Sequence, residues 1–337
     1  MVNKISLSDK IFIAGANGMV GSAIERKLIK SGYGDEMRGG KILTPSREEL
    51  NLLDYNKLKK WFVLNKPEVV IIAAAKVGGI FANANNPLDF LLQNLKIQTN
   101  IIELSFESHV KRLLFLGSSC IYPKFSRQPI KEEYLLTGSL EKTNEMYAIA
   151  KIAGIKLCES LRIQENFDAI SLMPTNLYGP GDNYSLRDSH VLAAFIRKFH
   201  DANINNSDTV TCWGSGSPLR EFLHVDDLSD AVKFVLENWD PKEHSFLDES
   251  NNHIFYLNVG TGKDITIKEL AEKIASKMNY QGKIIWEKSK PDGTPKKQLD
   301  ISKLKELGWQ AKIDLNHGLD LTIKSFKEEL INKKCRL

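Results

Sequence analysis

A serine, a cysteine, a tyrosine and a lysine occur in two short segments near the middle of the chain. The first reads Gly117-Ser118-Ser119-Cys120-Ile121-Tyr122, and the second reads Tyr147-Ala148-Ile149-Ala150-Lys151. On a helix, Tyr147 and Lys151 share one face, and an ammonium near a phenol is expected to lower the pKa of the phenol. With the Ser118 hydroxyl beside them, they predict a site that polarises a carbonyl or an alcohol and exchanges a proton with it.

A glycine-rich segment near the N-terminus has the spacing G-x-x-G-x-x-G. It follows an apolar segment, 10–14, and precedes a predicted helix over 22–31. In that context the glycines let a pyrophosphate approach the free N–H groups of a helix N-terminus, which indicates a dinucleotide site; the alternative is a plain tight turn. The candidate cofactor-binding residues here are Gly15, Ala16, Asn17, Gly18, Met19, Val20 and Gly21.

The end of the second predicted strand indicates which dinucleotide is bound. An NAD site typically has an acidic residue there for the ribose hydroxyls, whereas this chain reads Thr44-Pro45-Ser46-Arg47. The cation of Arg47 suits a 2′-phosphate, so NADP(H) is the predicted cofactor. The alternative is that Arg47 is the solvated start of the next segment, and the neighbouring Glu48 and Glu49 favour that alternative.

Apolar segments alternate with predicted helices through the first half of the chain. This order predicts an α/β fold with a doubly wound parallel sheet of the Rossmann type. We expect a cofactor-binding domain over 1–173, joined by a returning strand near 254–259, and a smaller α/β substrate lobe over 174–337. The predicted strands are 10–14, 42–44, 69–75, 111–116 and 169–172, and the predicted helices are 22–31, 56–64, 86–108 and 145–165.

Composition narrows the class of protein. The chain has 337 residues, is 42% hydrophobic, and balances 46 basic against 42 acidic residues for a net charge of +4, so nucleic acid is not an expected partner. Four cysteines without a C-x-x-C pair predict no metal site and a reducing compartment. The N-terminal segment is polar, and the apolar runs are too short to cross a membrane, so a soluble cytoplasmic protein is expected.

These motifs together resemble the extended short-chain dehydrogenase/reductase superfamily, and the resemblance spans nearly the whole chain. It implies a nucleotide-sugar substrate, NADP(H) as cofactor, and a homodimer formed through the helix over 145–165. Asn17 stands where some members carry an arginine near the 2′-phosphate. The segments that carry the resemblance are 15–21, 74–80, 116–123, 147–154, 174–180, 189–191, 213–216 and 220–227.

The resemblance also implies the reaction and the residue roles. It implies GDP-4-keto-6-deoxy-D-mannose as substrate, inversion at C3 and C5, and reduction of the C4 ketone, with Cys120 as the base and His190 as the acid. The implied catalytic residues are Ser118, Cys120, Tyr147, Lys151 and His190. Further cofactor contacts are implied for Lys151, Pro174, Thr175, Asn176, Leu177 and His190. The implied substrate-binding residues are Lys198, Trp213, Arg220 and Asp292.

Other interpretations of these residues remain open. A free cysteine is commonly a small buried residue, and Asp292 precedes a glycine, as turn residues often do. A related 4-epimerase or 4,6-dehydratase with recycled NAD is the alternative enzyme, although dehydratases normally have a carboxylate where this chain has Cys120. A non-catalytic NADP-binding scaffold is a third possibility, and such proteins usually lose the tyrosine or the lysine of the pair.

Overall fold

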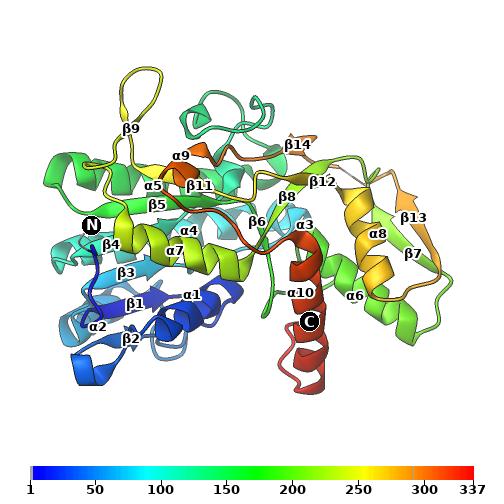
Figure 1. Ribbon diagram of the computed structural model, residues 1–337, viewed down its shortest axis with the longest axis horizontal. Helices are drawn as coiled ribbons and strands as arrows, with labels where there is room; N and C mark the ends of the chain where they lie inside the picture. The colour runs from blue at the N-terminus through cyan, green and yellow to red at the C-terminus, as the bar shows by residue number, and fades with distance from the viewer. Residues whose placement is uncertain (1–2, 291) are drawn as a thin grey trace.

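The computed structural model describes residues 3–290 and 292–337, and within them six strands form one parallel sheet in the order β11-β5-β4-β3-β1-β2 (Figure 1). The predicted doubly wound α/β fold is therefore confirmed. The chain returns to this sheet late, because β11 pairs in parallel with β5, as expected for 254–259. The strands are β1 (Lys10–Ala14), β2 (Lys41–Leu43), β3 (Val69–Ile72), β4 (Arg112–Leu116), β5 (Ala169–Pro174) and β11 (Tyr256–Val259).

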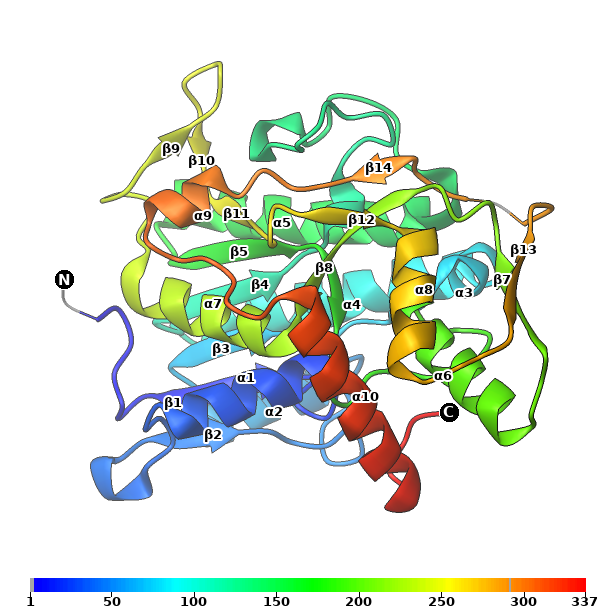
Figure 2. The same cartoon turned by 45° about the vertical axis from the view of Figure 1, so that its right-hand side comes forward.

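Both faces of the sheet are buried, which explains the uninterrupted apolar runs of its strands. Phe12 packs into the core cluster on one face, whereas Ile11 and Ile13 pack into the cluster on the other, because side chains alternate along a strand. Helices α1 and α7 lie together over one face, and α4 packs with α2 and α5 on the other (Figure 2). These helices are α1 (Met19–Lys30), α2 (Tyr55–Asn65), α4 (Pro87–Glu107), α5 (Glu145–Glu165) and α7 (Val225–Asn238).

A smaller α/β region lies beside the carboxyl ends of the main strands (Figure 1). Strands β12, β8 and β14 form one small sheet, with β6 beside β8, and β13 pairs with β7. A third core cluster lies beneath α6, α8 and α10. The remaining elements are α3 (Ile80–Asn85), β6 (Asn176–Tyr178), α6 (Val191–Ile204), β7 (Thr209–Trp213), β8 (Leu219–His224), β9 (Phe246–Leu247), β10 (His253–Ile254), β12 (Asp264–Thr266), α8 (Ile267–Lys277), β13 (Lys283–Glu287), β14 (Lys296–Lys297), α9 (Ser302–Glu306) and α10 (Leu315–Ile331). Among the described residues, no helix is long and apolar enough to cross a bilayer.

Element boundaries differ from the sequence prediction where loops that could bind a ligand begin. Helix α1 starts at Met19 rather than at residue 22, because the glycine segment leads directly into the helix. Strand β3 ends at Ile72 rather than at residue 75, where the chain leaves the sheet beside Gly15. Helix α5 has the predicted bounds, and the predicted capping box of Thr266 and Glu269 opens α8.

One buried carboxylate ties the two regions together. Glu221, on β8, is fully buried and accepts backbone hydrogen bonds from Thr261 (2.5 Å), Gly262 (2.7 Å) and Leu299 (2.8 Å). Its own backbone carbonyl accepts bonds from the Thr175 hydroxyl (3.2 Å) and the Asn176 amide (2.8 Å). Glu221 therefore fixes the turn after β11, the segment after β14 and the segment after β5 relative to one another.

Replacing this carboxylate is expected to destabilise the whole molecule. Glu221→Ala leaves three backbone donors without their acceptor, and we expect a loss of about 3–5 kcal/mol in the free energy of unfolding, measured by urea denaturation. Glu272→Ala, at an exposed position on α8, is the control and should change stability by less than about 0.5 kcal/mol. A comparably small change for Glu221→Ala would contradict the proposed role of Glu221 in holding the three segments together.

Candidate active site

The glycine segment between β1 and α1 has the shape that a dinucleotide requires. Gly15 has φ +89°, and a Cβ there would lie 2.7 Å from the backbone of Ala74. A Cβ at Gly21 would lie 2.2 Å from the carbonyl oxygen of Gly15. Gly18 is the N-cap of α1 and makes no side-chain cap, so the first N–H groups of the helix face an open loop. This cradle fits a pyrophosphate at a helix N-terminus.

Ser118, Cys120 and Tyr147 lie together beyond the carboxyl end of β4. Ser118 is the N-cap of the short 3₁₀ turn 119–121, and its Oγ accepts a bond from the backbone N–H of Cys120 at 3.2 Å. Tyr147 lies in the first turn of α5 and packs edge-on against Phe90, with 6.4 Å between ring centres. Helix α5 packs against the 119–121 turn, and Asn144, three residues before Tyr147, donates to the Cys120 sulfur at 3.2 Å, so Tyr147 lies close to Ser118 and Cys120.

Lys151 lies one helical turn below Tyr147 and is almost fully buried. Its Nζ donates to the carbonyl oxygen of Leu116 at 2.8 Å and lies 5.9 Å from the centre of the Tyr147 ring. The carbonyl bond fixes the ammonium beneath the tyrosine. Burial lowers the pKa of Lys151 from 10.5 to about 7, because charging the amine in this position sacrifices hydration.

The expected lowering of the tyrosine pKa is wrong for this structure. Burial and the nearby Cys120 raise the pKa of Tyr147 above its usual value, and hydrogen bonding by Ser118 opposes them only in part. The physical reason is that desolvation disfavours the phenolate, while Lys151 loses charge through its own burial. Tyr147 is therefore a neutral phenol near pH 7, which suits donation of a proton to a carbonyl oxygen.

Cys120 has two nitrogen donors on its sulfur. Asn144 Nδ2 lies 3.2 Å and Lys297 Nζ lies 3.4 Å from Sγ. Burial acts to raise the pKa of this thiol, but the charge of Lys297, hydrogen bonds from Ser118 and Lys297, and the charge of Arg220 outweigh it and lower the pKa. The structure thus provides surroundings that favour a thiolate, the form in which cysteine acts as a base or nucleophile.

His190 lies at the N-cap of α6 and its side chain reaches water. Its segment is held against the loop after β3, since Gly79 N–H donates to the Asp188 carbonyl at 2.9 Å. Desolvation by the surrounding protein, with the charge of Lys297, lowers the pKa of His190. Lys297 therefore influences both His190 and Cys120, which places the two groups near the same cation.

The four predicted substrate residues form one group on the smaller region. Lys198 Nζ lies 5.4 Å from the centre of the half-exposed Trp213 ring, and Arg220 Nη2 donates to the Asp292 carbonyl at 3.3 Å. The carboxylate of Asp292 accepts bonds from the backbone N–H (2.7 Å) and hydroxyl (2.8 Å) of Ser215. Asp292 thus joins its own turn to the loop that contains Ser215. This structural role explains part of why an aspartate stands there.

The remaining predicted cofactor residues occupy two places. Pro174, Thr175, Asn176 and Leu177 lie where β5 gives way to β6, with Thr175 and Asn176 held by the Glu221 carbonyl. Arg47 is exposed in the turn after β2, and Asn17 is exposed in the glycine segment. The role of Arg47 at a 2′-phosphate stays a prediction.

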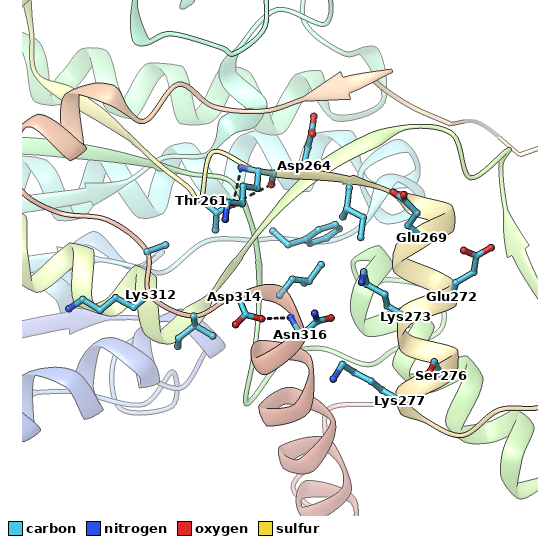
Figure 3. Close-up of a pocket in the computed structure, with 16 residues that line it drawn as sticks. Thr261, Asp264, Glu269, Glu272, Lys273, Ser276, Lys277, Lys312, Asp314 and Asn316 are labelled. Atoms are coloured by element: carbon cyan, nitrogen blue, oxygen red, sulfur yellow. Dashed lines mark hydrogen bonds between the residues drawn. The ribbon is translucent and has the colours of Figure 1, made fainter.

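A groove of about 960 Å³ lies elsewhere, between α8 and the start of α10 (Figure 3). Its described lining includes Thr261, Lys273 and Asn316 but none of the predicted catalytic residues. Its lining includes four lysines and four acidic residues (Lys263, Lys273, Lys277 and Lys312; Asp264, Glu269, Glu272 and Asp314), so its net charge favours neither anions nor cations. We assign the chemistry to the Cys120 site, where the reactive side chains converge.

Sequence reasoning missed two neighbours of the cysteine. Asn144 lies three residues before Tyr147, as the N-cap of α5, and its closeness in sequence to a predicted catalytic residue is the signal that could have identified it. Lys297 is 177 residues from Cys120 along the chain, and a lysine in the pair Lys296-Lys297 has no distinguishing pattern. The pairing of β14 with β8 and the bonds of Gln128 to this segment bring it to the sulfur.

Comparisons with known proteins agree with the fold and the motifs. Residues 11–247 match the NAD dependent epimerase/dehydratase family. GDP-L-fucose synthase 1 of Arabidopsis thaliana is 50% identical over 331 residues, which cover 97% of this chain and 97% of the relative. GDP-L-fucose synthase of Escherichia coli (strain K12) is 49% identical over 320 residues, covering 95% of this chain and 97% of the relative.

A solved structure of a related enzyme has a similar fold. The GDP-mannoheptose C4 reductase MlghC from Campylobacter jejuni, with NADP bound, has a TM-score of 0.83 at 34% identity and covers 96% of this chain and 99% of its own. The resemblance inferred from the motifs is thus confirmed, and the chain belongs to the NAD dependent epimerase/dehydratase family.

Proposed function

We propose that this chain converts GDP-4-keto-6-deoxy-D-mannose to GDP-L-fucose, with epimerisation at C3 and C5 followed by NADPH-dependent reduction at C4. The observation that carries the proposal is the position of Cys120 next to Ser118 and against the start of α5, where Tyr147 lies, with Lys297 Nζ at 3.4 Å from its sulfur. The GDP-L-fucose synthases, at 50% and 49% identity, support the same reaction.

Epimerisation needs a base, an acid and a group that holds an enolate oxygen. The C4 ketone acidifies the hydrogens on C3 and C5, so the Cys120 thiolate can take a proton from the ring carbon. Ser118 and Tyr147 donate hydrogen bonds to the C4 oxygen as negative charge develops there. His190 delivers a proton to the opposite face of that carbon, and because its side chain reaches water, it can be protonated again from solvent.

Reduction uses the same hold on the C4 oxygen. When bound, NADPH supplies the hydride for C4. Tyr147, a neutral phenol whose pKa is raised by burial, donates its proton to the alkoxide oxygen that forms. Lys151, whose pKa is lowered to about 7, can then return a proton to the phenolate. One pair of hydroxyls therefore serves both steps.

The two regions divide the ligands between them. We assign the cofactor to 1–173 with the returning strand near 254–259, and the GDP-sugar to the lobe within 174–337. Supporting features are the glycine cradle before α1 and the group of Lys198, Trp213, Arg220 and Asp292. The Arg220 guanidinium suits the diphosphate, and the exposed Trp213 ring offers an apolar surface. Arg47 is assigned to the 2′-phosphate.

We also propose a homodimer through α5 and a cytoplasmic location. In support of a dimer, α4 and α5 pack side by side and carry the exposed apolar side chains Leu92 and Ile149. The four cysteines are free, as in a reducing compartment. Sedimentation as a monomer at micromolar concentration would contradict the dimer, and recovery of the native protein from a secreted fraction would contradict the location.

The product of the reaction tests the proposed function. Purified protein incubated with NADPH and GDP-4-keto-6-deoxy-D-mannose is expected to give GDP-L-fucose and NADP⁺ in equal amounts, measured by chromatography and NMR. Tyr147→Phe should reduce NADPH oxidation by roughly 100-fold or more, because no phenol proton is available. Tyr55→Phe, on α2, is the control. A reduced sugar that keeps the original configuration at C3 and C5 would favour a simple C4 reductase instead.

The buried Lys151 side chain is expected to lower the free energy of unfolding of the protein, because burial disfavours its charged form. The unfolded chain binds this proton up to about pH 10.5 but the folded chain only up to about pH 7, so wild-type stability should rise with pH between these values. Lys151→Met removes the group, and the variant's advantage in free energy of unfolding should be larger near pH 6 than near pH 10 by at least about 2 kcal/mol. Urea denaturation at both pH values measures it. An advantage that does not change with pH would show that burial of the ammonium carries no such penalty.

A further inference from the structure

Lys297 reaches the reactive sulfur from a part of the chain that the catalytic motifs do not include. It lies on β14, which pairs in parallel with β8 so that Lys297 stands opposite Arg220. The backbone is fixed on its other side as well, since the Lys296 carbonyl accepts a bond from Gln128 (3.2 Å) and Gln298 N–H donates to Gln128 Oε1 (3.0 Å). Strand pairing and Gln128 therefore fix the backbone from which the Lys297 side chain reaches the sulfur.

We propose that Lys297, assisted by Asn144, holds Cys120 as a thiolate and is a positioning residue for epimerisation. The inference rests on the proposed function, in which Cys120 is the base. Two donors converge on one sulfur, Asn144 Nδ2 at 3.2 Å and Lys297 Nζ at 3.4 Å, and only the second carries charge. A cation that contacts the sulfur favours the thiolate, and a neutral amide donor fixes its direction.

Among the described charged groups near the Cys120 sulfur, Lys297 is the cation that contacts it, because the others are directed to other partners. Arg220 is positive but directs hydrogen bonds to the carbonyls of Leu219 and Asp292. Glu141 lines the same small cavity of about 20 Å³ beside Cys120, and its carboxylate is bridged to Lys124 at 2.8 Å. Tyr122, which lines the cavity, and Tyr147 are neutral phenols because burial raises the pKa of each, and desolvation together with the charge of Lys297 lowers the pKa of His190.

Alkylation of the thiol tests this proposal without any substrate. The pH dependence of the rate at which iodoacetamide modifies Cys120 is measured in a Cys335→Ser background, with the adduct located by peptide mass spectrometry. The two other cysteines are buried, with the pKa of Cys158 raised to about 12 and that of Cys212 to about 11, so they react slowly. The neutral variants are Lys297→Met and Lys297→Gln, Lys297→Arg keeps the charge, and Lys296→Met is the matched control. Lys296 is bridged to Asp264 at 3.2 Å and points to the other side of the strand.

The proposal predicts a specific pattern. Both neutral variants should shift the alkylation profile to higher pH, with a roughly 10-fold slower rate near neutral pH, while rates converge at high pH. Lys297→Arg and Lys296→Met should keep the wild-type profile, and all variants should bind NADPH as the wild type does. An unchanged profile in the neutral variants would overturn the role of Lys297, and a loss of NADPH binding would show that its role is structural. If the profile shifts but GDP-L-fucose does not form in the wild type, the proposed function fails and the thiolate site stands.

Discussion

The structure depends on the buried carboxylate of Glu221 and on the hydrogen bonds that it accepts from three backbone N–H groups. These bonds join the turn after β11 to β8 and to the segment after β14, and the site lies where those segments meet. A buried carboxylate is stable only when its oxygens are hydrogen-bonded, so the three segments cannot move apart without exposing unpaired groups. The positions of Arg220 and Lys297 follow directly from this constraint, because each lies within two residues of a bonded position.

The chemistry arises from the edge at which the parallel strands end. Strand β4 delivers Ser118 and Cys120, α5 delivers Tyr147 and Lys151, and the loop after β1 provides the glycine cradle. Burial makes Tyr147 a neutral phenol and lowers the pKa of Lys151 to about 7, whereas neighbouring charges and hydrogen bonds lower the pKa of Cys120 against the effect of burial. Proton donor and proton acceptor are thereby separated within one pocket, as an epimerase and reductase requires.

Local pattern was sufficient to predict the main sheet and the motifs that lie on it. The strand over 10–14 has its predicted bounds, the strand predicted over 69–75 forms over Val69–Ile72 and is buried on both faces, and the helix over 145–165 has the bounds that its pattern indicated. Contacts between distant segments were not predictable in this way: Lys297 meets Cys120 through contacts of β14 with β8 and Gln128, and Asp292 meets Ser215 where two loops adjoin. The tyrosine pKa was wrongly predicted for a related reason, since helical spacing places Lys151 near Tyr147 but carries no information about burial.

The central claim is that the Cys120 sulfur removes the protons at C3 and C5 of a ketosugar held by Tyr147. It is tested most directly by incubating the wild type and Cys120→Ser with GDP-4-keto-6-deoxy-D-mannose and NADPH in D₂O, and by locating deuterium in the sugar by NMR. The account predicts deuterium at both carbons with the wild type and none above the enzyme-free background with Cys120→Ser, because a serine hydroxyl is too weakly acidic to form the required anion. Deuterium at the wild-type level at both carbons in a folded, NADPH-binding Cys120→Ser variant would contradict it.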